Sequence, residues 1–290
     1  MRKLKVAIIG TGNIGTDLLI KILKSDFMEL IIFVGRRKES KGIQTAIKLN
    51  APVSYDGIEY FKANKNSCDV VYDCTDATSA RAHAPLFKEQ GIKVIDLTPS
   101  KVGEMCVPSV NPEAIIENDN INMITCGGQA TLPLISLISK HYKTLEYVEL
   151  VSQIASKSAG MGTRINVDSY IHTTEKALRT FANCENCKVI LNLNPADPCV
   201  DMQTTIFIRG KGLNFDKSLA AIQQRVSDIK KYVPHYELIT PPTINDQGVL
   251  TMSVRVRGLG DYLPKYAGNL DIINCASIEL TRNLWEKTNE

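Results

Sequence analysis

Apolar residues occur in short runs that alternate with amphipathic stretches through the first third of the chain. Five of these runs have the length and composition of buried strands: residues 4–9, 29–35, 70–73, 94–97 and 122–125. Three amphipathic stretches have helical spacing: residues 15–25, 79–90 and 112–117. This order of elements is typical of a doubly wound parallel sheet, and it predicts an α/β domain over residues 1–125.

The pattern changes after this point and predicts an α+β domain over residues 126–268. Its expected helices are residues 132–141, 166–183 and 215–232, and its expected strands are residues 145–156, 189–193, 204–209 and 249–257. The sheet is expected to be antiparallel. Pro241-Pro242 and the turn at residues 245–248 are expected to be loops. A final helix is expected at residues 270–287. The segment that contains it, residues 269–290, is expected to return to the first domain and complete it.

Composition supports a globular protein with a small ligand. The 290 residues suit two domains, and 44% hydrophobic with 22% charged residues exclude disordered and fibrous classes. The 34 Lys and Arg residues are scattered among 31 Asp and Glu residues, so no basic block favours nucleic acid or an acidic membrane. Eight sparse cysteines, no signal-peptide pattern and no membrane-length apolar run predict a soluble, cytoplasmic protein with free thiols.

A complete GxGxxG motif occupies residues 10–15, directly after the first predicted strand and at the start of the first predicted helix. In this context Gly10 permits a tight turn, Gly12 lets a pyrophosphate approach the backbone, and Gly15 lets the helix pack against the strand. Amides at the helix N-terminus then hold the phosphates. The motif predicts a dinucleotide site, and the alternative is a glycine-rich turn without a ligand.

The second predicted strand ends in basic residues, where an NAD-binding strand usually ends in a carboxylate that accepts hydrogen bonds from the ribose. Arg36 and Arg37 stand there instead. A guanidinium pairs well with a 2′-phosphate, so the sequence predicts that NADP is accepted, with NAD use and a solvated basic loop as the alternative.

Cys126 stands at the end of a predicted strand, before Gly127 and Gly128 and before a helix start marked by Thr131 and Pro133. Backbone amides left free by the glycines, together with the positive end of the helix, are expected to lower the thiol pKa from about 8.5 and to hold an oxyanion. Cysteine is otherwise a common buried apolar residue, which remains the interpretation of the other seven.

Two further patterns carry weaker signals. Asp168 and His172 lie about 40° apart on one predicted helix, so both could face inward, and His172 is a candidate base, with a structural or solvated histidine as the alternative. The Cys184-x-x-Cys187 pair invites a metal or redox interpretation. A single pair lacks the second pair that a zinc site needs, which favours a loop without such a function.

Six long, irregular segments occur in one order along nearly the whole chain: residues 10–17 (GTGNIGTD), 95–100 (IDLTPS), 122–133 (NMITCGGQATLP), 156–166 (SKSAGMGTRIN), 194–198 (NPADP) and 262–272 (YLPKYAGNLDI). With these segments the chain resembles the CoA-acylating acetaldehyde dehydrogenases that work beside 4-hydroxy-2-oxovalerate aldolases. The resemblance implies a homodimer and an aldolase partner.

The resemblance also implies roles for individual residues. Cys126 matches the family's nucleophile, which forms a thiohemiacetal and then an acyl-enzyme, and Asn269 matches an asparagine beside the cofactor and the oxyanion. Thr11, Gly12, Asn13 and Ile14 match the pyrophosphate loop. A second cofactor-contacting loop is matched by Ser158, Ala159, Gly160, Met161, Gly162, Thr163, Arg164, Ile165 and Asn166, with Met161 in place of the usual proline.

Three departures from the family pattern bear on these roles. Thr204 stands where the family has an aspartate suspected as a base, while Asp197 and Asp201 lie nearby in the sequence. Arg37 stands where relatives tend to have an acidic residue. Residues 236–257 form a shorter segment than in most relatives, which affects the expected dimer or aldolase contacts.

The expected reaction is oxidation of a short aldehyde, acetaldehyde or propanal, with NAD or NADP and CoA. Cys126 would add to the aldehyde, hydride would leave to the nicotinamide, and CoA would take the acyl group from the thioester. The alternatives are a phosphorylating semialdehyde dehydrogenase, which releases its thioester to phosphate, and a nucleotide-binding subunit without catalytic activity in an aldolase complex. No metal site is expected.

Overall fold

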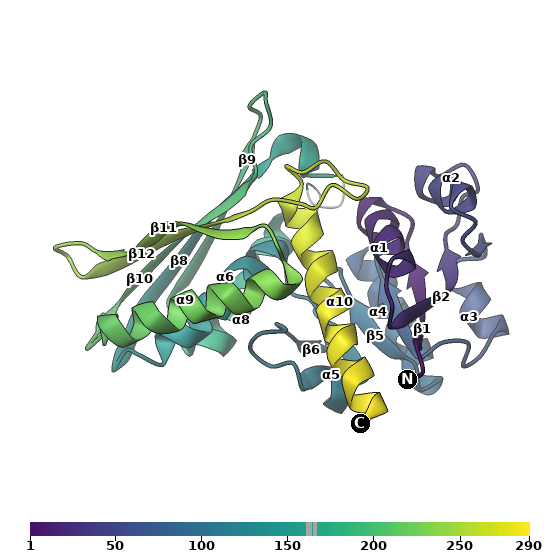
Figure 1. Ribbon diagram of the computed structural model, residues 1–290, viewed down its shortest axis with the longest axis horizontal. Coiled ribbons are helices and arrows are strands. Elements are labelled where there is room, and N and C mark those ends of the chain that lie inside the picture. Colours follow the sequence, from purple (N-terminus) through teal and green to yellow (C-terminus); the bar gives the residue numbers. More distant parts are fainter. Residues whose placement is uncertain (161–163, 165–166) are drawn as a thin grey trace. The chain divides into compact units, whose positions relative to one another are not determined.

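A seven-stranded parallel sheet organises the first of two compact units of the protein, which comprises residues 1–123, 261–263 and 276–290. The computed structural model describes residues 1–160, 164 and 167–290 (Figure 1). The strands are β1 (Leu4–Ile9), β2 (Met28–Val34), β3 (Val53–Ser54), β4 (Val70–Asp73), β5 (Lys93–Asp96), β6 (Glu104–Met105) and β7 (Asn120–Asn122). Their order in the sheet is β3-β2-β1-β4-β5-β7-β6, which confirms the predicted doubly wound α/β class.

Helices connect these strands: α1 (Asn13–Leu23), α2 (Lys41–Lys48), α3 (Glu59–Ala63), α4 (Ala77–Glu89) and α5 (Ala114–Glu117). Val6, Ala7 and Ile8 in β1 are fully buried, because helices cover both faces of a parallel sheet and its central strands need apolar side chains on both. The carboxyl ends of β1, β2 and β4 therefore meet at one edge, where ligands bind in folds of this class.

The second unit, residues 124–260 and 264–275, is built on a five-stranded sheet. Its elements are α6 (Cys126–Ser139), β8 (Thr144–Ala155), the 3₁₀ turn Ser156–Ser158, α8 (Val167–Ala182), β9 (Cys187–Asn194), β10 (Met202–Lys211), α9 (Phe215–Tyr232), β11 (Tyr236–Ile244) and β12 (Val249–Val256). The strand order is β11-β12-β10-β8-β9. Every pair is antiparallel as predicted except β8 with β9, which is parallel.

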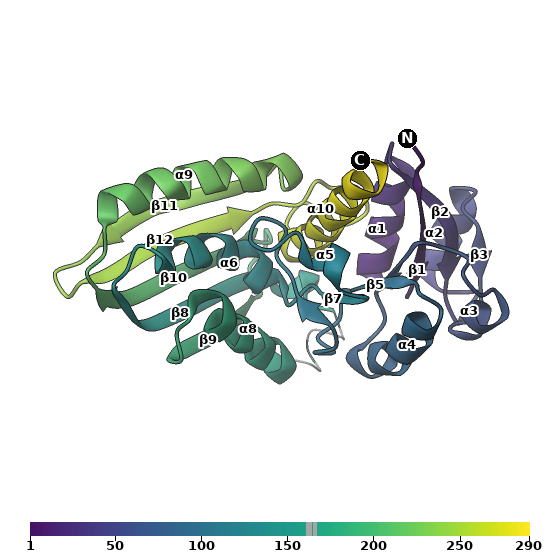
Figure 2. The same ribbon diagram turned by 90° about the horizontal axis from the view of Figure 1, so that it is seen from below.

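Side chains alternate between buried and half-exposed along β10 and β12. Helices α6, α8 and α9 contact strands of this sheet and account for its buried face (Figures 1 and 2). Figure 2 shows α9 running along β11. One face of the sheet is thus packed and the other is left with partly apolar, half-exposed side chains.

The last helix, α10 (Gly268–Asn289), contributes residues 268–275 to the second unit and 276–289 to the first. Within the first unit, the Trp285 indole donates a hydrogen bond of 2.8 Å to the Arg2 carbonyl, and its ring lies 5.7 Å from that of Phe27. The Thr281 hydroxyl pairs with that of Tyr72 on β4. These contacts fix the end of the chain on the first unit.

Three sequence-based expectations differ clearly from the structure. Helix α6 begins at Cys126 rather than at residue 132, because Thr125 caps it: the Thr125 hydroxyl accepts a 3.0 Å hydrogen bond from the Gly128 amide. Strand β7 ends at Asn122, three residues early. Pro241 and Pro242 lie inside β11 rather than in a loop, because β11 is an edge strand and its pairing with β12 is irregular around them.

Candidate active site

The glycine loop has the backbone geometry that the motif predicts. Gly10 has φ +108°, and a Cβ there would lie 2.5 Å from the Cys74 carbonyl carbon. A Cβ on Gly15 would lie 2.0 Å from the Gly10 carbonyl oxygen, so only glycine lets α1 start this close to β1. Gly12 caps α1, and the position of its missing Cβ faces open space. The loop therefore has room for a dinucleotide pyrophosphate at a helix N-terminus.

Arg36 and Arg37 follow β2 at the same edge of the sheet. A Cβ on Gly35 would lie 2.8 Å from the Thr11 methyl carbon, so the end of β2 lies against the glycine loop. Both arginines are exposed. Hydrogen bonds from Ser79, and more weakly the charge of Arg36, hold the pKa of Asp76 below its usual value. Arg36 thus already has a nearby carboxylate, whereas among the described residues Arg37 makes no ion pair.

Cys126 is the first residue of α6 and is half-buried. Its thiol lies 3.8 Å from the Tyr170 hydroxyl of α8. Burial raises the thiol pKa to about 11, although Tyr170 and the amides of Gly127 and Cys126 act to lower it. The predicted net lowering is therefore wrong for the ligand-free chain: the helix N-terminus acts in the expected direction, but desolvation outweighs it.

The Gly128 amide is also occupied rather than free, because its N–H donates to the Thr125 hydroxyl. The Gly127 amide acts to lower the pKa of both Cys126 and Tyr170, so it lies beside the sulfur and the phenol. Tyr170 is also hydrogen-bonded to the Ser152 hydroxyl of β8. Ser152 is in turn 3.0 Å from the Thr204 hydroxyl of β10. Cys126 is thus followed by a row of buried hydroxyl groups, Tyr170, Ser152 and Thr204, here named the hydroxyl row.

The candidate bases of the sequence do not approach this row. Asp168 and His172 are exposed on α8 and do not face inward, and the His172 side chain is 67% exposed with Glu175 3.9 Å away, which agrees with the solvated alternative. The Asp197 side chain is 81% exposed and lies 3.6 Å from Lys157, while Asp201 faces Arg257 at 3.9 Å. In the described part of the chain, no histidine is hydrogen-bonded to Cys126.

Asn269 lies at the start of α10 and is 2% exposed. Within the described residues its side-chain carbonyl oxygen has no hydrogen-bond partner. A buried acceptor without a partner costs stability unless a ligand supplies the donor. Asn269 is therefore suited to bind a polar group of a substrate or cofactor in the second unit.

The second predicted cofactor loop is described only in part. The Ser158 hydroxyl donates 2.8 Å to the Ala155 carbonyl, and Gly160 faces open space. The Arg164 guanidinium folds back onto the loop, donating to Ala159 and Ser156. The five other predicted residues, Met161, Gly162, Thr163, Ile165 and Asn166, lie outside the described residues.

Buried carboxylates at the ends of β4 and β5 form another polar group that the sequence analysis missed. Asp73 pairs with the His83 ring at 2.7 Å, and Asp96 accepts hydrogen bonds from Thr98, Ser100 and Asn122. Burial raises the pKa of Asp96 to about 6. Each carboxylate anchors its own loop, which is a structural role.

The Cys184-x-x-Cys187 pair shows no ligand geometry. The Cys187 thiol donates to the Cys184 carbonyl at 2.9 Å, and all eight cysteines of the chain are free. Over the residues that the structure describes, no group of three or more His, Cys, Asp or Glu side chains is arranged for a metal ion. No described helix is long and apolar enough to cross a membrane.

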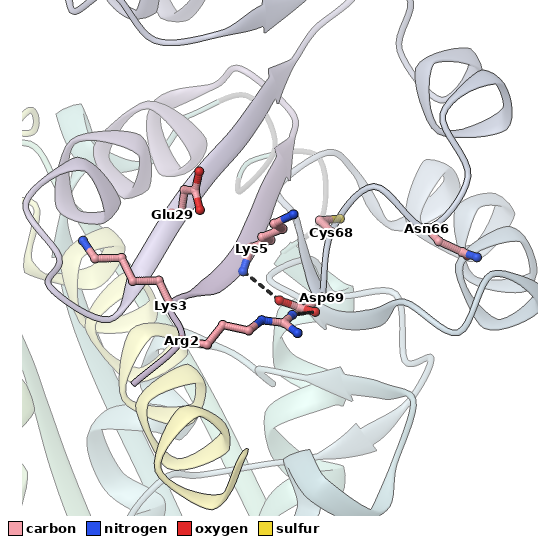
Figure 3. Close-up of a pocket in the computed structure, with 7 residues that line it drawn as sticks. All are labelled: Arg2, Lys3, Lys5, Glu29, Asn66, Cys68 and Asp69. Carbon is pink, nitrogen blue, oxygen red and sulfur yellow. Dashed lines mark hydrogen bonds and ion pairs between the residues drawn. The ribbon is translucent and has the colours of Figure 1, made fainter. Parts of the chain in front are cut away.

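An open pocket of about 510 Å³ lies at the amino ends of β1, β2 and β4 (Figure 3). Its lining residues are Arg2, Lys3, Lys5, Glu29, Asn66, Cys68 and Asp69. Asp69 pairs with Arg2 and accepts a hydrogen bond from the Lys5 amide. Because the glycine loop follows the carboxyl end of β1, this pocket is not the dinucleotide site.

Comparison with known proteins agrees with this division of the chain. Residues 5–118 match the family "Semialdehyde dehydrogenase, NAD binding domain", and residues 126–264 match "Prokaryotic acetaldehyde dehydrogenase, dimerisation". Acetaldehyde dehydrogenase of Spirochaeta aurantia is 48% identical over 100% of this chain and 97% of its own. The Pectobacterium atrosepticum enzyme of the same name is 48% identical over 97% of this chain and 95% of its own.

Solved structures show the same fold at low sequence identity. Aspartate semialdehyde dehydrogenase II of Vibrio cholerae, complexed with ASA, has a TM-score of 0.67 at 14% identity, with 98% of both chains covered. This likeness concerns the fold alone.

Proposed function

Because the chain belongs to the acetaldehyde dehydrogenase family, we propose that it is a CoA-acylating enzyme that oxidises acetaldehyde or propanal with NAD or NADP. The proposal rests on one observation. A half-buried thiol occupies the first residue of α6, beside the backbone amides of the helix start and a buried tyrosine hydroxyl. That is the setting of a cysteine nucleophile.

The reaction begins when the Cys126 thiolate adds to the aldehyde carbon and forms a carbon–sulfur bond. We expect the Cys126 and Gly127 amides, which already act on the sulfur, to stabilise the resulting oxyanion together with the Asn269 side chain. A bound nicotinamide supplies the acceptor for the hydride that leaves the adduct. Cys126 then carries a thioester.

The second half transfers the acyl group. The CoA thiolate attacks the thioester carbon, a new carbon–sulfur bond forms, and the bond to Cys126 breaks. The sum is aldehyde, CoA thiol and oxidised cofactor giving acyl-CoA, reduced cofactor and one proton. Phosphate as acceptor would give the semialdehyde dehydrogenase chemistry instead, but that alternative is expected to pair the cysteine with a histidine, and the described residues place none there.

The test is Cys126→Ser, assayed for CoA-dependent reduction of NAD or NADP by absorbance and for acyl-CoA by mass spectrometry. We expect turnover to be abolished, since the hydroxyl cannot act as the thiolate does. Cys199→Ser is the matched control, because Cys199 is also free and half-buried. Wild-type turnover in Cys126→Ser, or equal rates with phosphate and with CoA, would refute the proposal. Absence of any aldehyde oxidation would favour the nucleotide-binding subunit.

We also propose a homodimer formed through the open face of the second sheet, within the segment that matches the dimerisation family. Val151, Thr205, Phe207 and Thr251 are half-exposed on that face. Phe207→Glu should place a charge in the interface and yield a monomer by light scattering. A dimer that survives this change would place the interface elsewhere. The aldolase partner and the cytoplasmic location stay predictions.

A further inference from the structure

Tyr170 is the one side chain, among the residues that the structure describes, that is hydrogen-bonded to the Cys126 sulfur. It is 8% exposed and comes from α8, 44 residues along the chain. Cys126 therefore has a buried phenol, rather than a carboxylate or an imidazole, as its partner.

Gly127 keeps the space that this phenol occupies. A Cβ at position 127 would lie 2.2 Å from the Tyr170 oxygen and 3.3 Å from the Ser152 oxygen. Any other residue would push Tyr170 away from the helix start and from the sulfur. The Gly127 amide and the Ser152 hydroxyl instead both lie beside the Tyr170 oxygen and act to lower its pKa.

The direction of the hydrogen bond between Tyr170 and Cys126 depends on the state of the sulfur. As a thiol, Cys126 donates to the Tyr170 oxygen. Once the sulfur is a thiolate it can only accept, and the Tyr170 hydroxyl within reach then donates to it. Burial holds the pKa of Tyr170 well above its usual value, so the phenol stays neutral over the working pH range. Tyr170 can therefore stabilise a thiolate but cannot act as the base that removes the thiol proton.

We propose that Tyr170 is a catalytic residue that stabilises the thiolate form of Cys126 by donating a hydrogen bond to its sulfur. This assignment rests on the proposed function for its place in the reaction. The hydrogen bond favours the nucleophile before it adds to the aldehyde. The same hydrogen bond stabilises the sulfur when CoA attacks the thioester and the carbon–sulfur bond to Cys126 breaks. The Tyr170 proton stays on its oxygen throughout.

The described surroundings of Cys126 suit this role because they hold no negative charge. The side chains that reach the site from α8, β8 and β10 are Tyr170, Ser152 and Thr204, all uncharged, and the charged Asp168 of α8 is exposed. No charged side chain of the described residues shifts the pKa of Cys126. A carboxylate at position 204 would disfavour a thiolate at Cys126, because two negative charges repel each other along the hydroxyl row. Neutral hydrogen-bond donors favour the thiolate instead.

The experiment measures alkylation of Cys126 by iodoacetamide against pH, with the Cys126 peptide followed by mass spectrometry so that the other cysteines do not contribute. Tyr170→Phe should raise the pH midpoint of the reaction by about one pH unit, which is a tenfold lower rate at pH 8, because only the thiolate reacts. Wild type itself should react faster as pH rises, since burial keeps the thiol protonated at neutral pH.

Tyr236→Phe is the matched control. Tyr236 is fully buried and its hydroxyl donates 2.7 Å to the Ala130 carbonyl of the same helix, so the change removes one buried hydrogen bond to α6 without touching Cys126. Its midpoint should equal that of wild type. An unchanged midpoint in Tyr170→Phe, or equal changes in both variants, would overturn the proposal.

Ser152→Ala provides a second variant should Tyr170→Phe fail to fold. It removes one hydrogen-bond partner of the Tyr170 hydroxyl, so the midpoint should rise by less than in Tyr170→Phe, and no rise would count against the proposal. The measurement needs neither aldehyde nor CoA. Tyr170 can therefore be shown to stabilise the thiolate even if the proposed reaction is wrong. Conversely, if the wild-type enzyme forms acyl-CoA and Tyr170→Phe keeps the wild-type midpoint, only the role of Tyr170 is rejected.

Discussion

The hydroxyl groups of Ser152 and Thr204 lie 3.0 Å apart because the two residues face each other directly across the antiparallel strands β8 and β10. Both are 1% exposed. Either hydroxyl can donate this hydrogen bond, and Ser152 is also hydrogen-bonded to Tyr170. Thr204 is thus the outer end of the hydroxyl row and the residue farthest along it from the sulfur.

This position predicts that Thr204→Val loses stability but keeps activity. Removing a buried hydroxyl and leaving Ser152 with one partner fewer should lower the free energy of unfolding by about 1 kcal/mol. Ser152 keeps its hydrogen bond with Tyr170, so kcat should stay within about twofold of wild type. Urea unfolding and steady-state assays measure the two effects.

Thr205→Val is the control for that variant. Thr205 pairs with Ser253 at 2.9 Å on the half-exposed face of the sheet, where water can replace the lost hydrogen bond. Its loss of stability should therefore be smaller. A large fall in kcat in Thr204→Val with normal stability would instead show that Thr204 itself takes part in proton transfer.

Gly127→Ala should reduce activity more than Gly128→Ala, although the two changes are identical and adjacent. A Cβ at 127 would lie 2.2 Å from the Tyr170 oxygen, which is fixed by buried hydrogen bonds, whereas at 128 the shortest contact is 2.9 Å to an Ile124 methyl carbon. Alanine otherwise favours a helix over glycine by about 1 kcal/mol. We expect kcat to fall at least tenfold in Gly127→Ala. Equal activities would show that the Tyr170 position is unimportant.

Gly12→Ala and Gly10→Ala should separate cofactor binding from folding. The missing Cβ of Gly12 faces open space and its φ is −77°, so alanine fits the free protein but crowds a bound pyrophosphate. We expect KM for the dinucleotide to rise at least tenfold with an unchanged Tm. Gly10→Ala meets the Cys74 backbone at φ +108° and should lower Tm instead. A normal KM in Gly12→Ala would place the pyrophosphate elsewhere.

The strands of the first unit are the part of the fold that the sequence predicts best. Residues 4–9 and 70–73 are predicted with the bounds that β1 and β4 have, because strands buried on both faces need unbroken apolar runs. Helix α2 is missed because it is only eight residues long and those residues are largely polar. The start of α6 is missed because Gly127 and Gly128 disfavour helix, and the tertiary packing around Thr125 and Tyr170 outweighs that preference.

The sequence predicts the nucleophile of the candidate site but not the residues that surround it. A motif marks Cys126, whereas Tyr170 reaches the sulfur from 44 residues away and no local pattern signals the contact. Ser152 did leave a signal: it is a polar residue at an inward position of a strand, which calls for a buried hydrogen bond. The thiol pKa could not be predicted, because it depends on burial in the folded chain.

Cofactor preference gives the last prediction, since Arg36 and Arg37 follow the same strand but differ in their surroundings. The charge of Arg36 already acts on Asp76, while Arg37 is exposed and, over the described residues, has no ion-pair partner. Arg37 is therefore the better candidate to bind a 2′-phosphate. Arg37→Ala should lower kcat/KM for NADP about tenfold, which is what one hydrogen bond to a charged group contributes. The kcat/KM for NAD should stay unchanged.

Lys38→Ala is the control, because it removes a neighbouring exposed charge from the same loop. If the arginine acts only through positive potential, kcat/KM for NADP should fall equally in both variants. If Arg37 contacts the phosphate directly, kcat/KM for NADP should fall only in Arg37→Ala. If wild-type kcat/KM is at least ten times higher with NAD than with NADP, the two arginines do not select for the phosphate. In that case the ribose of NAD must find its hydrogen-bond acceptors elsewhere at this edge, since β2 ends without a carboxylate.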